Sequence, residues 1–144
     1  MRLEFLRLDP SVALPAFAHP GDAGLDLAAN AEVVVGPGER ALVPTGLAVA
    51  IPQGHAGLVL PRSGLASKRG LTLANAPGLI DSGYRGEVTI AVVNLDPHEK
   101  VEIARGDRVA QLVVVPLAEV EPVEVAELPG TPRGEGGFGS SGTR

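Results

Sequence analysis

The chain contains no cysteine and no tryptophan, and it has only one tyrosine and three phenylalanines among its 144 residues. Without cysteine, neither a disulfide framework nor a thiolate metal site can form. Aromatic residues make up only 3% of the chain, although 44% of it is hydrophobic. The core must therefore be built mainly from Val, Leu, Ile and Ala.

Long apolar runs are also missing. No charged segment precedes an apolar signal core, and no apolar run approaches the length that spans a membrane. We therefore expect a soluble, cytoplasmic protein with no membrane partner. The formal net charge is −5, so broad electrostatic attraction to nucleic acid is not expected. An anionic ligand would have to be bound by a few placed arginines and by backbone N–H groups.

What the chain has in quantity is short β-branched runs separated by turn residues. Its 19 glycines and 13 prolines are spread along the sequence, which indicates many turns between short elements. Turn signals recur at intervals of roughly 8–12 residues, which is typical of a sandwich, jelly roll or barrel. The length fits one domain. The strand-like runs are residues 2–8, 31–35, 40–52, 56–61, 87–95, 100–104 and 107–117.

One segment, "SGLASKRG", reads as a helix. Ser63 is the expected N-cap, cations lie in the last turn, and Gly70 stands where the chain leaves the helix. Beyond Leu117 the strand pattern gives way to an acidic stretch. We therefore predict an all-β domain over residues 1–128 and a flexible, Gly-rich segment over residues 129–144.

Polar side chains gather in four segments between or beside the runs. In "GDAGLDLAA", Asp26 lies between two leucines, either as a turn residue or as a partly buried carboxylate that needs hydrogen-bond partners. In "PRSGLASKRG", Arg62 and Ser63 combine a guanidinium with a hydroxyl at a helix start. This combination suits phosphate, but a capping serine beside an exposed arginine would look the same.

The other two segments lie nearer the C-terminus. "NAPGLIDSGYRGEV" places Asn75, Asp81 and Tyr84 in what we predict to be a long turn between strands. These side chains could read a base edge, accept a proton from water and stack on a ring, although an Ω-loop packed on its own tyrosine remains possible. In "GDRVAQL", Gln111 is an amide within an apolar run, and a core hydrogen bond is its usual explanation.

Other motifs carry less information. The three histidines are scattered without metal-ligand spacing, and no spacing supports a Ser/His/Asp triad. Glycines 134, 136 and 139 satisfy G-x-G-x-x-G, but no strand precedes them and no helix follows, so they are not a dinucleotide fingerprint.

Taken in order, five segments resemble the five motifs of the trimeric dUTP pyrophosphatase (dUTPase) family. They are "AGLDL", "RSGLA", "NAPGLIDSGYRGE", "GDRVAQL" and "RGEGGFGSSG", at residues 23–27, 62–66, 75–87, 106–112 and 133–142. The resemblance implies a jelly-roll-like, distorted β-barrel with one short helix, assembled as a homotrimer with shared active sites. It implies hydrolysis of dUTP to dUMP and pyrophosphate with Mg²⁺, which keeps uracil out of DNA and supplies dUMP for thymidylate synthesis.

Roles for individual residues follow from the same resemblance. Asp81 would activate the attacking water, and Asp26 would support the site near the metal-bound phosphates, with a possible contact to Mg²⁺ through water. No residue is assigned as a direct metal ligand, because Mg²⁺ would be held by the substrate phosphates. The implied substrate-binding residues are Arg62, Ser63 and Gly64 for phosphate, Gln111 for the end of the triphosphate, Asn75, Leu79, Ile80 and Asp81 for uracil and deoxyribose, Tyr84 for the sugar, and Arg133, Phe138 and Gly139 from the tail.

In this interpretation the tail is a lid rather than a linker. Arg133 would pair with phosphate and Phe138 would stack on uracil, while glycines let the backbone approach the anion closely. Two alternatives remain at this point. One is a dCTP deaminase-like or bifunctional nucleotide enzyme of the same fold, and the other is a non-enzymatic β-sandwich interaction module.

Overall fold

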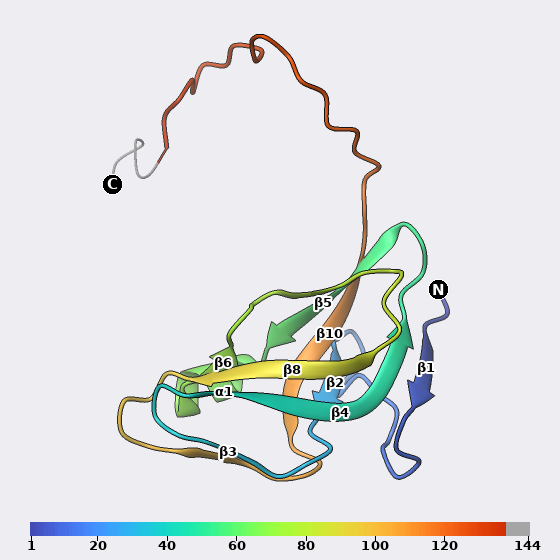
Figure 1. The fold of residues 1–144 in the computed structure, drawn as a ribbon, viewed down its shortest axis with the longest axis vertical. Helices are drawn as coiled ribbons and strands as arrows, with labels where there is room; N and C mark the ends of the chain where they lie inside the picture. The colour runs from blue at the N-terminus through green and yellow to red at the C-terminus, as the bar shows by residue number, and fades with distance from the viewer. Residues whose placement is uncertain (138–144) are drawn as a thin grey trace.

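Two four-stranded antiparallel sheets and a two-stranded ribbon form the body of the chain in a computed structural model that describes residues 1–137 (Figure 1). The first sheet has the order β1-β4-β8-β6, the second β2-β10-β5-β7, and the ribbon pairs β3 with β9. The elements are β1 (Glu4–Arg7), β2 (Leu25–Ala28), β3 (Val33–Val35), β4 (Arg40–Ala50), β5 (His55–Pro61), α1 (Ser63–Arg69), β6 (Leu71–Leu73), β7 (Gly78–Ile80), β8 (Glu87–Asn94), β9 (Val101–Ile103) and β10 (Arg108–Pro116).

The core lies where the inward faces of both sheets meet. Val43, Ile90 and Val92 from the first sheet and Leu27 and Leu112 from the second are at most 1% exposed. Strand β8 buries every second residue, because alternate side chains of a strand point to opposite faces. The all-β fold built from aliphatic side chains is confirmed.

The sequence also predicts the helix, but not its first residue. Ser63 is the first helical residue, while Arg62 is the N-cap, with extended backbone angles and no capping hydrogen bond from its side chain. The expectation that Ser63 caps the helix is therefore wrong, because the carbonyl of Arg62 already accepts the N–H groups of Leu65 and Ala66. Gly70 ends the helix as expected, with φ of 64°. The seven residues of this helix cannot cross a membrane, and no other described segment is a long apolar helix.

Three short strands fall outside the runs expected from the sequence. Strand β7 lies within the segment interpreted as a long turn, β2 covers the polar segment around Asp26, and β6 follows α1. Each has only three or four residues. They are strands because longer neighbours supply their hydrogen-bond partners: β5 for β7, β10 for β2 and β8 for β6.

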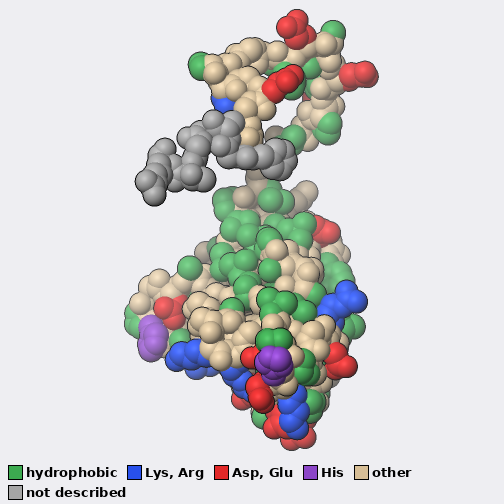
Figure 2. All heavy atoms as spheres, turned by 90° about the vertical axis from the view of Figure 1, so that its left-hand side faces the viewer, with side chains coloured by type: hydrophobic (Ala, Val, Ile, Leu, Met, Phe, Trp, Pro, Cys, Tyr) green, Lys and Arg blue, Asp and Glu red, His purple; other side chains and the backbone are tan. Residues whose placement is uncertain are grey.

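After β10 the chain leaves the sheets. Residues 117–137 form neither helix nor strand, and they run away from the body (Figures 1 and 2). In this segment Val120, Val123 and Leu128 are at least 70% exposed. The predicted boundary at residue 128 stays a prediction.

Candidate active site

The predicted site residues of the body gather in two separate pockets. The first, the β7–β8 pocket, has a volume of about 200 Å³ and is lined by Asn75, Leu79, Ile80, Asp81 and Tyr84 among others. The second, the Asp26 pocket, has a volume of about 500 Å³ and is lined by Asp26, Arg62, Ser63, Gly64 and Gln111 among others. Of residues 1–137, none lines both pockets.

The β7–β8 pocket is built on an edge strand. Strand β7 pairs with β5 on one side only, so its other side presents backbone N–H and C=O groups that a ligand can use. The side chain of Ile80 points into the core, whereas Leu79 is 64% exposed. This arrangement suits a planar ligand that is recognised through backbone groups.

Asp81 and Tyr84 follow β7 in a tight turn. The N–H of Tyr84 donates to the carbonyl of Asp81 at 3.1 Å, and the Tyr84 hydroxyl donates to the carbonyl of Glu87 at 2.9 Å. Tyr84 is therefore held both at its backbone N–H and at its hydroxyl, while Asp81 stays exposed to solvent. A carboxylate in this position is accessible to a water molecule in the pocket.

The Asp26 pocket contains a carboxylate held between two guanidinium groups. Arg62 Nε lies 3.3 Å from Asp26 Oδ1, and Arg108 Nη1 lies 2.9 Å from Asp26 Oδ2. Arg62 Nη1 also donates to the carbonyl of Arg108 at 3.0 Å. The side chain of Asp26 is only 16% exposed, which answers the question left open by the sequence: Asp26 is a partly buried carboxylate with charged partners. Two cations and one anion leave a net positive charge that suits phosphate.

Small and polar residues complete this pocket. An added Cβ on Gly64 would meet no atom within 4 Å, so the space beside it is open to a ligand. Gln111 donates from Nε2 to the carbonyl of Pro61 at 3.1 Å. Its Oε1 lies 2.7 Å from the point where a Cβ on Gly24 would stand. The expected hydrogen bond of Gln111 is thus present, and its amide also faces the pocket.

The fold does not bring the two predicted catalytic carboxylates together within one chain. Asp26 is on β2 and Asp81 directly follows β7, and these strands are the opposite edges of the second sheet. Three inter-strand spacings separate the edges, or about 14 Å. In the tail, Arg133 donates to the carbonyl of Gly136 and lines neither pocket. The predicted contributions of Phe138 and Gly139 lie outside the described residues.

Among the pocket residues that sequence reasoning did not select are Arg108 and Glu87, which both make contacts across the fold. Arg108 stands within the fourth polar segment, but its pairing with Asp26 depends on the contact between β2 and β10. Glu87 lines the β7–β8 pocket and accepts the N–H of Gly46 at 2.7 Å. Nothing in the local sequence distinguishes it from a surface glutamate at a strand start.

Comparison with known proteins identifies the same family that the motifs resemble. The dUTPase family model matches residues 11–142. The deoxyuridine 5'-triphosphate nucleotidohydrolase of Streptomyces coelicolor is 59% identical over 136 residues, which are 94% of this chain and 74% of that protein. Its counterpart from Thermobifida fusca is 54% identical over 142 residues, covering 99% and 79%.

Solved structures agree with the sequence relatives. The dUTPase of Staphylococcus bacteriophage 80alpha with dUpNHpp has a TM-score of 0.89 and 34% identity, and the match covers 99% of each chain. A mutant dUTPase from phage phi11 of S. aureus, described with a structural Mg(II) ion, has a TM-score of 0.82 and 31% identity, and the match covers 88% of this chain and 98% of that one. The jelly-roll-like fold expected from the motifs is therefore confirmed.

Proposed function

This chain belongs to the dUTPase family, and from that premise we infer that it hydrolyses dUTP to dUMP and pyrophosphate. The observation that carries this conclusion is the pair of pockets. One offers an edge strand, a tyrosine ring and an accessible carboxylate, and the other offers paired arginines. The first pocket suits a nucleoside and the second suits a triphosphate. The comparisons do not favour the deaminase or the non-enzymatic module.

The β7–β8 pocket binds the nucleoside. Asn75 and the backbone of Leu79, Ile80 and Asp81 pair with uracil and hold the deoxyribose. A bound base shields these polar groups from water, so a wrong base leaves them unpaired, and this costs more binding free energy than a missing apolar contact does. The Tyr84 ring packs against the sugar and leaves no room for a 2′-hydroxyl.

Asp81 is the general base of the reaction. The oxygen of a water molecule forms a bond to phosphorus at the α–β phosphoanhydride, and the bond from that phosphorus to the bridging oxygen breaks. The water proton passes to Asp81, and pyrophosphate leaves with the electron pair. This chemistry needs an oriented water and charge neutralisation rather than a covalent nucleophile.

The Asp26 pocket binds the triphosphate. Arg62, Ser63 and Gly64 contact the phosphate oxygens, and Gln111 reaches the terminal part. The carboxylate of Asp26 fixes the Arg62 guanidinium at Nε, so the remaining N–H groups of Arg62 are held ready for an anion. Fixed donors lose little freedom when the substrate binds.

The residues of the Asp26 pocket also fit a Mg²⁺ ion that arrives with the substrate. Among the described residues, no group of three or more His, Cys, Asp or Glu could form a protein cage for a metal. Mg²⁺ usually keeps several waters and uses one or two carboxylates together with substrate phosphates, and Asp26 can serve as that carboxylate through water. Held there, Mg²⁺ would supply positive charge that neutralises the phosphate oxygens.

The chain functions as a homotrimer with shared sites. The two pockets lie at opposite edges of one sheet, so a site that uses both is completed by a neighbouring subunit. The tail then contributes Arg133, Phe138 and Gly139 as a lid. The site that this lid covers is one of the sites shared between subunits. Sedimentation of a stable monomer would contradict this assembly, and full activity after truncation at Thr131 would contradict the lid.

A nucleotide panel tests the function itself. With Mg²⁺, we expect the protein to release pyrophosphate from dUTP far faster than from dTTP, dCTP or UTP. Equal rates on all four, or no release from dUTP, would overturn the proposal. The reaction keeps uracil out of DNA and supplies dUMP for thymidylate synthesis, and a cytoplasmic location fits this role.

A further inference from the structure

The Tyr84 ring is packed against the backbone of a glycine two residues further along. An ideal Cβ on Gly86 would lie 2.7 Å from Tyr84 Cζ and 3.0 Å from Cε2, and it would also collide with the hydroxyl oxygen. The φ angle of Gly86 is outside the left-handed region, so its backbone conformation is one that other residues adopt. Glycine is therefore needed at this position because it has no side chain, and not because of its backbone conformation. Any other residue would displace the ring.

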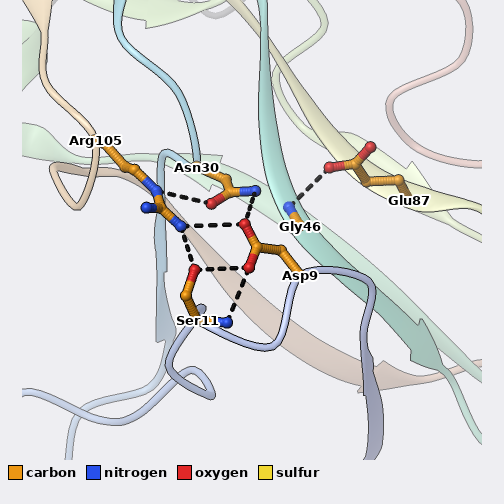
Figure 3. A network of polar contacts seen from close by, with 6 residues as sticks. All are labelled: Asp9, Ser11, Asn30, Gly46, Glu87 and Arg105. Carbon is orange, nitrogen blue, oxygen red and sulfur yellow. Dashed lines mark hydrogen bonds and ion pairs between the residues drawn. The ribbon is translucent and has the colours of Figure 1, made fainter.

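The hydroxyl end of the ring is anchored by the next residue. Tyr84 Oη donates to the backbone carbonyl of Glu87 at 2.9 Å. The Glu87 side chain in turn accepts the N–H of Gly46 at 2.7 Å, across 41 residues of sequence. Figure 3 shows Glu87 reaching Gly46 on the neighbouring strand. The carbonyl that holds the tyrosine is thus itself fixed by a contact to β4.

The anchoring point on β4 is a rigid irregularity of the sheet. The pairing of β4 with β8 shifts register between Pro44 and Ala48, and Gly46 has φ of 68°. Buried Thr45 donates from Oγ1 to the carbonyl of Val88 at 2.6 Å. A bulge braced in this way has few alternative positions for Gly46.

Gly46 is also held from the side opposite Glu87. Its carbonyl accepts the N–H of Leu8 at 2.8 Å and the N–H of Asp9 at 3.4 Å, and Asn30 Nδ2 donates to Asp9 Oδ2 at 3.3 Å. Asn30 belongs to a cluster in which Asp9 accepts from Ser11 and Arg105 (Figure 3). The tyrosine ring therefore rests on a chain of contacts that runs from Glu87 through Gly46 to this cluster.

We propose that Gly86 and Glu87 are specificity-determining positioning residues: Gly86 sets how close the Tyr84 ring stands to its own loop, and Glu87 fixes the hydroxyl end of that ring. The discrimination between deoxyribose and ribose depends on both. This proposal rests on the proposed function, in which Tyr84 excludes the 2′-hydroxyl. Excluding a single added group depends on a close fit, so a small displacement of the ring is enough to weaken the selection.

Two pairs of variants test the proposal. Gly86→Ala introduces the clash, and Gly83→Ala is its matched control in the same loop, because a Cβ on Gly83 would meet nothing within 4 Å. Glu87→Ala removes the acceptor for the Gly46 N–H, whereas Glu87→Gln keeps a carbonyl oxygen in its place. The second pair tests the proposal independently if Gly86→Ala fails to fold.

The first readout is the ratio of kcat/KM for dUTP to that for UTP. Gly86→Ala should lower this ratio about tenfold or more, and Glu87→Ala several-fold. Gly83→Ala and Glu87→Gln should stay within about twofold of the unmodified protein, as expected where the contact is kept. An equal loss on both substrates in Gly86→Ala and Glu87→Ala would overturn the proposal.

The second readout does not depend on activity. Tyr84 is the only tyrosine and the chain has no tryptophan, so circular dichroism near 280 nm and fluorescence excited near 280 nm, where the three phenylalanines absorb very little, report on this one ring. Both spectra should change in Gly86→Ala and Glu87→Ala and stay unchanged in the two control variants. If the unmodified protein failed to hydrolyse dUTP, the proposed function would be wrong. The spectra would still show whether Gly86 and Glu87 fix the position of the Tyr84 ring. Unchanged spectra in Gly86→Ala and Glu87→Ala would overturn the positioning itself.

Discussion

The two pockets differ in what they can distinguish. The β7–β8 pocket is the smaller, at about 200 Å³ against about 500 Å³, and it combines backbone groups of an edge strand with the ring of Tyr84 and the carboxylates of Asp81 and Glu87. The Asp26 pocket is organised by charge, with Arg62 and Arg108 on either side of Asp26. Shape and hydrogen-bond pairing select a nucleoside, whereas charge selects a phosphate chain. Substitutions in one region should therefore change selectivity, and substitutions in the other should change affinity for the triphosphate.

The two regions also depend on different parts of the fold. The β7–β8 pocket is supported by a contact from β8 to the bulge in β4. The Asp26 pocket is supported by the pairing of β10 with β2 and β5. The β8–β4 contact lies in the first sheet and the β10–β2 pairing in the second, although both pockets also use β5, which pairs with β7 and with β10. Effects of substitutions at the β8–β4 contact and at the β10–β2 pairing should accordingly be close to additive.

The largest expected effect is at Asp81, where a substitution should change the rate of the chemical step rather than substrate binding. Asp81→Asn keeps the size of the side chain but removes the base, so kcat should fall by about 10²–10⁴-fold. Binding of a non-hydrolysable dUTP analogue, measured by calorimetry, should be retained. Turnover at the level of the unmodified protein would remove Asp81 from the role of base.

A smaller and different effect is expected at Arg62. Arg62→Ala removes the guanidinium that contacts both Asp26 and the carbonyl of Arg108. Charged hydrogen bonds contribute roughly 1.5–3 kcal/mol each, so KM for dUTP should rise about 10–100-fold, and the dUTP-to-UTP ratio should stay unchanged.

Arg69→Ala is the matched control for Arg62→Ala. Arg69 lies at the other end of α1, donates to the carbonyl of Glu102 at 3.4 Å, and does not line the Asp26 pocket. Its removal should leave KM within about twofold, as is usual for surface positions. An equal rise of KM in the two variants would show that the Asp26 pocket does not bind the triphosphate. A changed dUTP-to-UTP ratio in Arg62→Ala would show that this pocket also affects the choice of nucleoside.

The sequence predicts the long strands well because their signal is local. Strands β4, β8 and β10 are β-branched runs bounded by turn residues, and such runs form strands in many contexts. Strand β7 carries no comparable signal, since it has three residues and begins with Gly78. It is a strand because β5 offers it a partner, and a single segment does not reveal its partner.

The same distinction applies to the candidate site. The motifs place Asp26, Arg62 and Asp81 in polar segments, and side-chain chemistry suggests what each can do. The pairing of Asp26 with Arg108 joins residues 82 positions apart, and the contact of Glu87 with Gly46 joins residues 41 apart. Such contacts depend on strand order and register. Sequence reasoning thus proposes the reacting groups, while the residues that hold them in place emerge only from the fold.

The smallest expected effect concerns Asp9, which lines neither pocket. The hydroxyl and the backbone N–H of Ser11 donate to its carboxylate, and these bonds, helped by Asn30 and Arg105, lower its pKa below the ordinary value of 3.8. A carboxylate whose pKa is lower in the folded state stabilises the fold above the unfolded pKa, and this contribution is lost as the pH falls through the folded value.

Asp9→Asn should therefore lower Tm slightly at pH 7, and the difference from the unmodified protein should shrink as the pH falls below about 3.8, the ordinary pKa of an aspartate. Thermal unfolding at a series of pH values measures this convergence. A gap that stayed constant with pH would show that the Asp9 charge does not stabilise the cluster. A change in the dUTP-to-UTP ratio without a change in Tm would instead mean that the cluster acts on the β7–β8 pocket through Gly46, and that selectivity depends on residues well outside the pocket.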